Sequence, residues 1–482
     1  MGPSAGDIHR PRISNTTAAV VRVLPVNVSA AARSSLAATG VAVVATFLVR
    51  ASHLRMVQLD YDDGVYWQTA LAVADGHQPY AEVFFAQPPL YAWLSALPFA
   101  LNGGELAARI ITIGWAVLLA AGAGILGRGL AGRYAGMAAA LLVAMLPPVQ
   151  RYCFQFGADL PTAALVTWSV VCAGRGRLRW WLASGTLLGV ALAMKLIAVV
   201  VLPALLVVTL MSRRWLAALA SMSVAAVAVC VLTLIVTRPP AVAWDQVVAL
   251  HLSAADAPGQ PVPAGATTML AVWIVPFGLL SAAGAFLCLR RLSRAQRPLV
   301  LALLVWGVSG VVFAGLHRPI FEHHLLLFVA PGAAIIAAGF FTLLRPRMHL
   351  VTTAALVLTC VVQVLTMPVS PRLEASAMLR CLRTLPVGSV LVTDDQEIAA
   401  RAGLRTPPWL ADTSRVRISS GYLTTSDIIT GAQGAVGVLF APSDRAKFVD
   451  PTIAEWARQE YPATYRADGY LLTTATPLGC RQ

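Results

Sequence analysis

The sequence is poor in charged residues and almost devoid of lysine. Only 12% of its 482 residues are charged, and lysine occurs twice, at Lys195 and Lys447. Soluble globular domains have about 25% charged residues, whereas here 58% of the residues are hydrophobic and the mean hydropathy is +0.72. Such a chain cannot cover a water-exposed surface. The composition therefore excludes a soluble protein and predicts an integral membrane protein.

Alternating polar and apolar positions and internal repeats are also lacking. Apolar stretches of helical length recur through residues 34–368, and several contain Gly or Pro, as membrane-spanning helices tolerate. A β-barrel would alternate instead, so we expect an α-helical polytopic membrane protein. Residues 1–33 contain arginines and no small-residue cleavage site after a short apolar core, which predicts a cytoplasmic tail rather than a signal peptide.

The net charge of +14 comes largely from arginines in short loops between the apolar stretches. Basic residues collect in cytoplasmic loops, so these arginines set the orientation and do not indicate nucleic acid binding. The clusters are Arg128 and Arg133; Arg175, Arg177 and Arg179; Arg213 and Arg214; Arg290, Arg291, Arg294 and Arg297; and Arg345 and Arg347. An even number of spans must separate neighbouring clusters. This parity predicts about eleven spans.

The expected spans are residues 34–59, 109–126, 134–150, 160–174, two within 181–210, 216–237, 269–289, 298–316, 325–344 and 349–368. Parity requires a hairpin of two short helices in 181–210, with Lys195 at its midpoint on the outer face. All the acidic residues before residue 369 except Asp7 then lie outside the cytoplasm. Acids contribute little to orientation, so this is independent support. We therefore expect the polar chemistry at the outer face.

Residues 369–482 have the pattern of a small extracytoplasmic α/β domain. GSVLVTDD and GAVGVLFAP are typical of strands, and IAEWARQEY is typical of a helix. The seven cysteines show no CxxC and no metal-site spacing, and most lie in apolar stretches. Cys381 and Cys480 bracket the domain, so a disulfide between them is compatible with an oxidising outer compartment.

Residues 59–67, LDYDDGVYW, bring three carboxylates to the start of an outer loop spanning residues 55–108. Asp62 and Asp63 are catalytic candidates, although aspartates at a helix start also serve as N-caps. Lys195 is a binding candidate, because ionisable groups at membrane depth are costly and usually functional. Snorkelling of its ammonium to the interface is the alternative. The ammonium is suited to a lipid phosphate.

Residues 317–324, HRPIFEHH, concentrate a cation, a carboxylate and three imidazoles between two spans. A divalent metal such as Mg or Mn is one interpretation, although adjacent histidines on one helix diverge. The metal-ligand candidates are Asp62, Asp63, Glu322 and His323. Hydrogen bonds from Arg318, His323 and His324 to a phosphate or sugar are the favoured interpretation. Arg151 and Asp159, in RYCFQFGADLP, form either an internal ion pair or part of the substrate site.

The first outer loop resembles that of the C-type membrane glycosyltransferases, a group that includes protein O-mannosyltransferases and lipid A aminoarabinose transferases. The bacterial pattern is an acidic pair, an aromatic residue, a helix, a glycine, a Pro-Tyr and a Pro-Pro pair. Here these are Asp62 and Asp63, Tyr66, Gly76, Pro79 and Tyr80, and Pro88 and Pro89. The resemblance continues through Asp159, Lys195 and the two histidines at 323 and 324, and covers residues 34–345.

The resemblance implies an inverting hexosyl- or pentosyltransferase that takes a sugar from a polyprenyl-phosphate carrier at the outer face of the cytoplasmic membrane. The acceptor would be a cell-envelope glycan, lipid or protein. Asp62 or Asp63 would be the general base, because the attacking hydroxyl must lose its proton. Lys195, with Arg318 or a histidine, would stabilise the departing phosphate. The other binding candidates are Tyr66, Gln87, Arg151, Asp159, His323 and His324.

One position departs from the pattern. Related enzymes often have Lys or His before the Pro-Pro pair, whereas Gln87 brings no charge. This shifts the expected phosphate contact to Lys195 and His323. A composition rich in Ala and Arg hints at an actinobacterium. Two other functions stay open: a transporter or flippase of lipid-linked sugars, which usually has repeats and broken helices, and a noncatalytic envelope scaffold. The sequence shows neither transporter feature.

Overall fold

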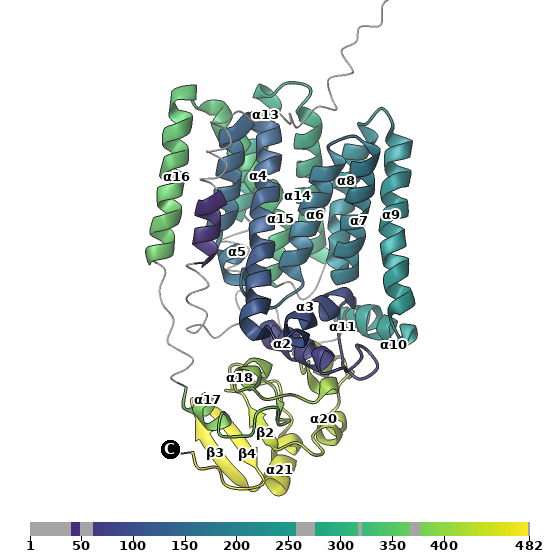
Figure 1. Cartoon of the computed structure of the whole chain (residues 1–482), viewed down its shortest axis with the longest axis vertical. Helices are drawn as coiled ribbons and strands as arrows, with labels where there is room; N and C mark the ends of the chain where they lie inside the picture. Colours follow the sequence, from purple (N-terminus) through teal and green to yellow (C-terminus); the bar gives the residue numbers. More distant parts are fainter. Residues whose placement is uncertain (1–39, 49–60, 257–274, 317–320, 367–375, 481–482) are drawn as a thin grey trace, which may run out of the picture.

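Helices dominate the structure and form a bundle, with a layer of short segments and a small C-terminal domain below it (Figure 1). The computed structural model describes residues 40–48, 61–256, 275–316, 321–366 and 376–480. The bundle contains α4 (Gly104–Met145), α6 (Asp159–Ala173), α7 (Leu178–Met194), α8 (Leu202–Leu210), α9 (Trp215–Val236), α13 (Val275–Arg291), α14 (Arg297–Leu316), α15 (Leu326–Leu343) and α16 (Pro346–Thr366). The shorter segments are α2 (Tyr61–Ala74), α3 (Leu90–Ala100), α5 (Pro147–Tyr152), α10 (Pro240–Trp244), η3 (Asp245–Ala249) and α11 (Leu250–Asp256).

Several predicted features lie outside the described residues. These are the N-terminal tail 1–33, Asp60, Arg318, and parts of the spans expected at 34–59 and 269–289. In the described part, the helices long and apolar enough to cross a membrane are Gly104–Met145, Trp215–Val236, Arg297–Leu316 and Glu322–Leu343. Shorter apolar helices such as α6 and α7 accompany them. The architecture is that of a helical membrane protein, while the count of about eleven spans stays a prediction.

Helix α4 is in fact two helices that fold back on each other. Its backbone leaves the helical region at Ala131 and Gly132, and Gly132 has a φ of +84°, which favours glycine because it has no Cβ. A Cβ on Gly124 would lie 3.1 Å from the carbonyl oxygen of Gly136. Residues twelve apart in a straight helix could not touch. The two arms correspond to the spans predicted at 109–126 and 134–150, but the second arm ends at Met145, ahead of Pro147.

The apolar stretch of residues 181–210 breaks at Lys195, as parity predicted. Helix α7 ends at Met194, and Lys195 has an extended backbone with φ −157° and ψ 126°. The chain then continues as the 3₁₀ segment η2 (Leu196–Val201) and α8, which has Pro203 in its first turn, where the missing N–H is tolerated. Both α7 and α8 contact α6 and α9. The break places the buried Lys195 between two helices at one end of the bundle rather than inside a continuous helix.

The C-terminal domain is built on a four-stranded sheet with the order β1-β2-β4-β3. The strands are β1 (Val392–Thr393), β2 (Gly437–Phe440), β3 (Ala463–Ala467) and β4 (Tyr470–Thr474). β1 and β2 are parallel, and the other pairs are antiparallel. The helices are α17 (Ala377–Leu382), α18 (Gln396–Arg401), α19 (Arg415–Ser419), α20 (Thr425–Gly431) and α21 (Pro451–Glu460). β1 and β2 lie within GSVLVTDD and GAVGVLFAP, whereas the hairpin of β3 and β4 had no counterpart in the sequence reading. A disulfide joins Cys381 to Cys480.

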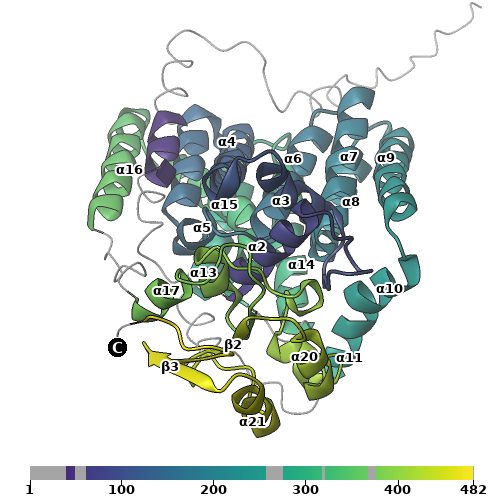
Figure 2. The ribbon, with the colours of Figure 1, turned by 60° about the horizontal axis from the view of Figure 1, so that its bottom comes forward.

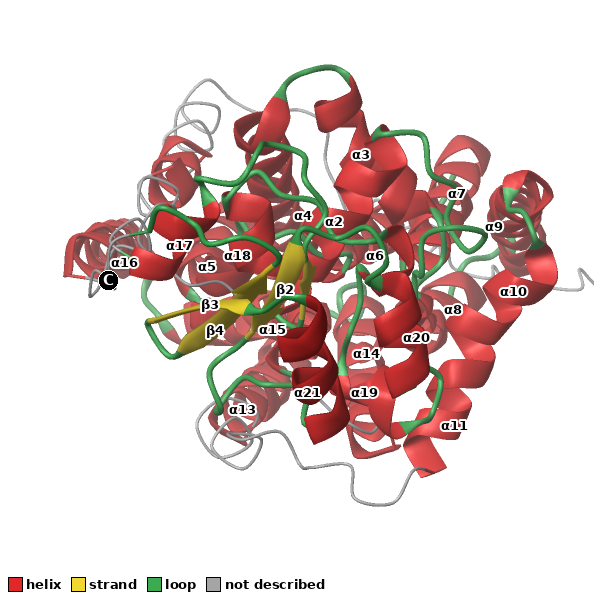
Figure 3. Cartoon of the chain, turned by 90° about the horizontal axis from the view of Figure 1, so that it is seen from below, coloured by secondary structure: helices red, strands yellow, loops and turns green. Residues whose placement is uncertain are grey.

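The C-terminal domain packs directly on α2, and Figure 3 shows its sheet from below, in front of the bundle. Gln68 of α2 donates to the carbonyl oxygen of Leu404 at 3.1 Å and accepts from the Thr406 N–H at 3.2 Å. Arg405 forms an ion pair with Asp75 at 2.7 Å. Seen with the lower end turned forward, α2 lies between the bundle and the domain (Figure 2). The first loop therefore lies between the bundle on one side and the C-terminal domain on the other.

Candidate active site

A cavity of about 550 Å³ lies where the bundle, the first loop and the C-terminal domain meet. Its walls come from the start of α2, the segment after Lys195, α11, the 3₁₀ turn η5 (Glu322–Leu325), and two loops of the C-terminal domain. The predicted site residues that line it are Asp62, Tyr66, Gln87, Lys195, His323 and His324. Its volume is in the range of small-ligand sites. The fold thus brings together residues that lie far apart in the sequence.

Asp62 and Asp63 are adjacent but face different environments. Successive residues of a helix point about 100° apart, so the first turn of α2 sends one carboxylate to the cavity and the other into the core. The Asp62 side chain is 47% exposed, and its Oδ2 lies 3.6 Å from Nδ1 of His323. Asp63 is fully buried and does not line the cavity. The two carboxylates therefore differ in access to a substrate.

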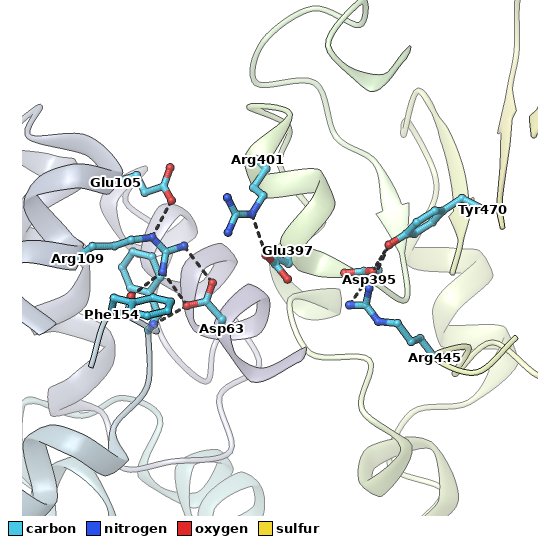
Figure 4. A network of polar contacts seen from close by, with 10 residues as sticks. Asp63, Glu105, Arg109, Phe154, Asp395, Glu397, Arg401, Arg445 and Tyr470 are labelled. Atoms are coloured by element: carbon cyan, nitrogen blue, oxygen red, sulfur yellow. Dashed lines mark hydrogen bonds and ion pairs between the residues drawn. The ribbon is translucent and has the colours of Figure 1, made fainter. Parts of the chain in front are cut away.

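Asp63 is locked in an ion pair with Arg109 of α4. Arg109 donates to both Asp63 oxygens, at 3.0 and 3.1 Å, and to the Phe154 carbonyl oxygen at 2.8 Å. Its Nε donates to Glu105 at 2.7 Å, as Figure 4 shows. Sequence reasoning treated Arg109 only as the edge of a span. The sequence feature that could have identified Arg109 as a buried partner is its position four residues after Glu105 in an apolar helix.

Lys195 is paired with Asp159 in the cavity wall. Its Nζ donates to both Asp159 oxygens, at 2.8 and 2.7 Å, and both side chains are 9% exposed. The internal pair of Arg151 and Asp159, one of the two sequence interpretations, is therefore wrong. Arg151 instead pairs with Glu322 at 2.6 Å and does not line the cavity. The carboxylate partner of each cation is supplied by tertiary contacts rather than by its neighbours in sequence.

The two histidines approach each other and Asp159. Their ring centroids are 4.5 Å apart, and ligand atoms of Asp159, His323 and His324 lie within 4.8 Å of one another. The argument that adjacent histidines diverge is thus wrong here, since the two rings contact each other at the 3₁₀ turn η5. This donor set resembles a metal site, but Lys195 occupies both Asp159 oxygens and would repel a cation.

The metal set expected from the sequence is not gathered in one place. Glu322 is paired with Arg151, and Asp63 is buried against Arg109, while Asp62 and His323 line the cavity. The described residues therefore do not fit the expected divalent site. What they provide at the inner end of the cavity is one ammonium, two imidazoles and one accessible carboxylate.

The outer wall of the cavity belongs to the C-terminal domain, in which sequence reasoning had identified no site residue. Asp412, Ser414, Arg415, Val416 and Lys447 line it. Tyr61 joins the two sides: its hydroxyl donates to Asp412 at 3.2 Å and accepts from the Thr413 N–H at 2.7 Å. Burial raises the pKa of Tyr61, with the Asp412 carboxylate adding to the effect, so the phenol stays protonated. The rarity of lysine was the one signal that pointed to Lys447.

A buried arginine attaches the first loop to the C-terminal domain. The Arg417 guanidinium lies 3.7 Å from the ring centroid of Phe84 and 4.7 Å from that of Trp409. Its Nη1 donates to the carbonyl oxygens of Trp409 and Asp412, at 2.7 and 2.6 Å. Burial lowers the pKa of Arg417 to about 10, which still leaves it charged near neutral pH. This cation–π contact fixes the stretch from Phe84 to Gln87 that lines the cavity.

The chain is similar to one protein family and to several solved structures. Residues 86–244 match the family described as dolichyl-phosphate-mannose-protein mannosyltransferase. No curated protein sequence matches the chain. Among solved structures, ArnT from Cupriavidus metallidurans bound to undecaprenyl phosphate has a TM-score of 0.64 at 15% identity, covering 90% of this chain and 97% of ArnT. The Archaeoglobus fulgidus oligosaccharyltransferase in complex with Zn and sulfate has a TM-score of 0.51 at 13% identity, covering 88% and 71%.

A second complex of the archaeal enzyme is similar in the same way. AglB from Archaeoglobus fulgidus, with an inhibitory peptide and a dolichol-phosphate, has a TM-score of 0.50 at 12% identity and covers 92% of this chain and 74% of its own. These likenesses establish the fold. The chain has the C-type glycosyltransferase fold, and the resemblance predicted from its first loop is confirmed by the mannosyltransferase family match over residues 86–244.

Proposed function

We propose that this protein transfers a sugar from a polyprenyl-phosphate carrier to a cell-envelope acceptor at the outer face of the cytoplasmic membrane. The observation that carries the proposal is a single cavity lined by an accessible carboxylate, Asp62, and an ammonium, Lys195. Apolar residues beside Lys195, including Leu196, Val199 and Phe313, also line it and suit an isoprenoid chain. The similar structures titled with undecaprenyl phosphate and dolichol-phosphate support a lipid-phosphate donor.

Asp62 is the proposed general base. A hydroxyl that attacks the anomeric carbon must lose its proton, and a carboxylate within hydrogen-bond reach accepts it. Asp62 has that access, and His323 lies 3.6 Å from it. Asp63, the second catalytic candidate from the sequence, becomes a positioning residue, because its ion pair with Arg109 fixes the first turn of α2.

Lys195 is the proposed ligand of the carrier phosphate. The leaving phosphate keeps its negative charge, so a fixed cation lowers the energy of the transition state. Asp159 holds the ammonium in place through two hydrogen bonds, and a lysine has a third N–H for the phosphate. His323 and His324 supply further donors, and the Gln87 amide and Tyr66 complete the candidate contacts in the cavity wall. Arg151, paired with Glu322, is left as a candidate at the edge of the site.

The geometry also supports an inverting displacement. In an inverting displacement the acceptor oxygen attacks opposite the leaving phosphate, with Asp62 on the acceptor side of the sugar and Lys195 on the phosphate side. The disulfide between Cys381 and Cys480 supports an extracytoplasmic C-terminal domain, because such bonds persist in oxidising compartments. The transferred sugar is a hexose or pentose, and the acceptor is a glycan, lipid or protein of the envelope.

A transporter or flippase of lipid-linked sugars is the second candidate. A cation beside apolar residues in the cavity, Lys195 with Leu196 and Phe313, would also suit the binding of a lipid-linked sugar by a transporter. Mass analysis of envelope glycans and glycoproteins after deletion of the gene separates the two. Loss of one sugar from a mature envelope component, with its lipid-linked form accumulating at the outer face, supports the transferase. A lipid-linked sugar trapped on the cytoplasmic face would support the transporter.

A further inference from the structure

The outer wall of the cavity contains polar groups that the proposed donor site does not use. Arg415 is exposed and lines the cavity, and within the described residues its only hydrogen bond runs from Nη2 to the Ala446 carbonyl oxygen, at 3.0 Å. A guanidinium has five N–H groups, so most of the donors of Arg415 face the cavity and solvent. Asp412 uses Oδ1 for the Tyr61 hydroxyl and the Ser414 N–H. The other oxygen of Asp412 accepts no hydrogen bond from the residues that the structure describes.

Lys447 adds a fixed positive charge beside these groups. Its Nζ donates to the carbonyl oxygens of Asp394 and Arg445, at 3.0 and 2.9 Å, and lies 3.9 Å from the Tyr61 ring centroid. The Asp394 carboxylate accepts the backbone N–H groups of Lys447 and Phe448, at 2.7 and 3.1 Å, which fixes this loop. Two cations therefore outnumber the single carboxylate, Asp412, on this wall.

The outer wall lies on the acceptor side of the proposed base. Tyr61 and Asp62 are adjacent in the first turn of α2, and the Tyr61 hydroxyl contacts Asp412 while the Asp62 carboxylate approaches His323. The base thus stands between the C-terminal domain and the inner residues around Lys195. If the carrier phosphate binds at Lys195, an acceptor that attacks from the opposite side of the sugar must come from the direction of Arg415 and Lys447.

We propose that Asp412, Arg415 and Lys447 form an acceptor subsite for a saccharide that carries an oxyanion, either a carboxylate or a phosphate. The inference rests on the proposed transferase function. Arginine binds carboxylates and phosphates through two parallel N–H bonds, and the carboxylate oxygen of Asp412 accepts a saccharide hydroxyl. The C-terminal domain therefore selects the acceptor, while the bundle holds the donor.

The test measures binding of saccharide probes to the full-length protein in lipid nanodiscs. Tetragalacturonate carries carboxylates, glucose 6-phosphate carries a phosphate, and maltotetraose and glucose are their neutral counterparts. We expect at least one acidic probe to bind about tenfold or more tightly than its neutral counterpart, as charge-assisted hydrogen bonds require. Arg415→Gln should remove this preference. The acidic probe that is preferred identifies the oxyanion.

A matched variant controls for the high positive charge of the chain. Arg466 is an exposed arginine of β3 that does not line the cavity, so Arg466→Gln should keep the preference. Equal affinities for acidic and neutral probes, or an equal loss in both arginine variants, would overturn the subsite. Binding of undecaprenyl phosphate is measured separately and should survive Arg415→Gln. Failure of the wild-type protein to bind that lipid would count against the transferase, whereas the probe preference alone decides the subsite.

Discussion

At the scale of single residues, the first turn of α2 separates two carboxylates that look equivalent in sequence. The sequence identified both Asp62 and Asp63 as catalytic candidates, but could not choose between them. The choice depends on the rotational phase of α2 and on Arg109, which lies 46 positions away from Asp63 in the chain. Similarly, Lys195 was predicted to be a binding residue because it is a rare cation in an apolar stretch, whereas Asp159 was considered either as a partner of Arg151 or as part of the substrate site.

Asp63→Asn tests the structural role of the buried ion pair. The substitution would remove the buried carboxylate partner of the Arg109 guanidinium, which is 1% exposed, and leave it only the partly exposed carboxylate of Glu105. Breaking one side of a buried pair costs about 3–5 kcal/mol, so we expect a clear fall in the melting temperature in detergent. Asp62→Asn is the matched control and should melt near the wild-type temperature, because Asp62 is half exposed. Equal melting of Asp63→Asn and wild type would contradict this assignment.

Lys195→Gln tests the phosphate ligand. Loss of the ammonium should raise the Kd for polyprenyl phosphate about tenfold or more, since a charged hydrogen bond contributes about 1.5–3 kcal/mol. Lys195→Arg keeps the charge beside Asp159 and should retain more of the affinity. Lipid binding is measured on both purified variants, together with thermal stability. An unchanged Kd in Lys195→Gln would show that Lys195 does not bind the phosphate and that its pairing with Asp159 is purely structural.

At the scale of elements, α2 and α18 touch backbone to backbone at Gly64. A Cβ at this position would lie 2.3 Å from the Glu397 amide nitrogen, so only glycine fits. Gly64 follows the two aspartates directly, and its contact therefore sets the position of the first turn of α2 against the C-terminal domain. The sequence could not reveal this requirement, because the two surfaces are more than 300 residues apart. By contrast, the hairpin within α4 was predictable from the arginines that flank its turn.

Gly64→Ala should disturb catalysis more than an average glycine substitution. Overpacking against backbone costs about 1–3 kcal/mol or more, and the strain is relieved by moving α2. We expect kcat for sugar transfer to fall while the KM for the donor stays near wild type. Gly114→Ala is the control, because a Cβ there meets nothing within 4 Å. A Gly64→Ala enzyme with wild-type kcat and stability would contradict this prediction, because it would show that α2 and α18 accommodate the added methyl group without loss of activity or stability.

At the scale of the whole molecule, the active cavity is assembled from the bundle, the first loop and the C-terminal domain. Composition and arginine parity were sufficient to predict a helical membrane protein with its acids on one face. The contribution of these residues of the C-terminal domain was not predictable, because Asp412 and Lys447 lie in loops and Arg415 begins the short helix α19, and none of them belongs to a motif. Their place in the cavity wall depends on tertiary packing of the C-terminal domain on Tyr61 and Phe84.

The orientation of the C-terminal domain can be tested through its disulfide. After mild reduction of intact spheroplasts, a membrane-impermeant thiol reagent should label Cys381 or Cys480, which are joined in the folded domain. The double variant Cys381→Ser/Cys480→Ser should lose this labelling, and its domain should be less stable by about 2–5 kcal/mol, as for other native disulfides. Labelling that appears only after the membrane is permeabilised would contradict an extracytoplasmic domain.

The most direct test of the central claim is the initial rate of sugar transfer from a labelled polyprenyl-phosphate sugar to an isolated envelope fraction by the reconstituted protein. A positioned general base typically contributes about 10²–10⁴-fold, so Asp62→Asn should lose that much of the wild-type rate while still binding the lipid donor. Glu82→Gln, which removes an exposed carboxylate of the same loop outside the cavity, should transfer at the wild-type rate. Full activity of Asp62→Asn would contradict the account.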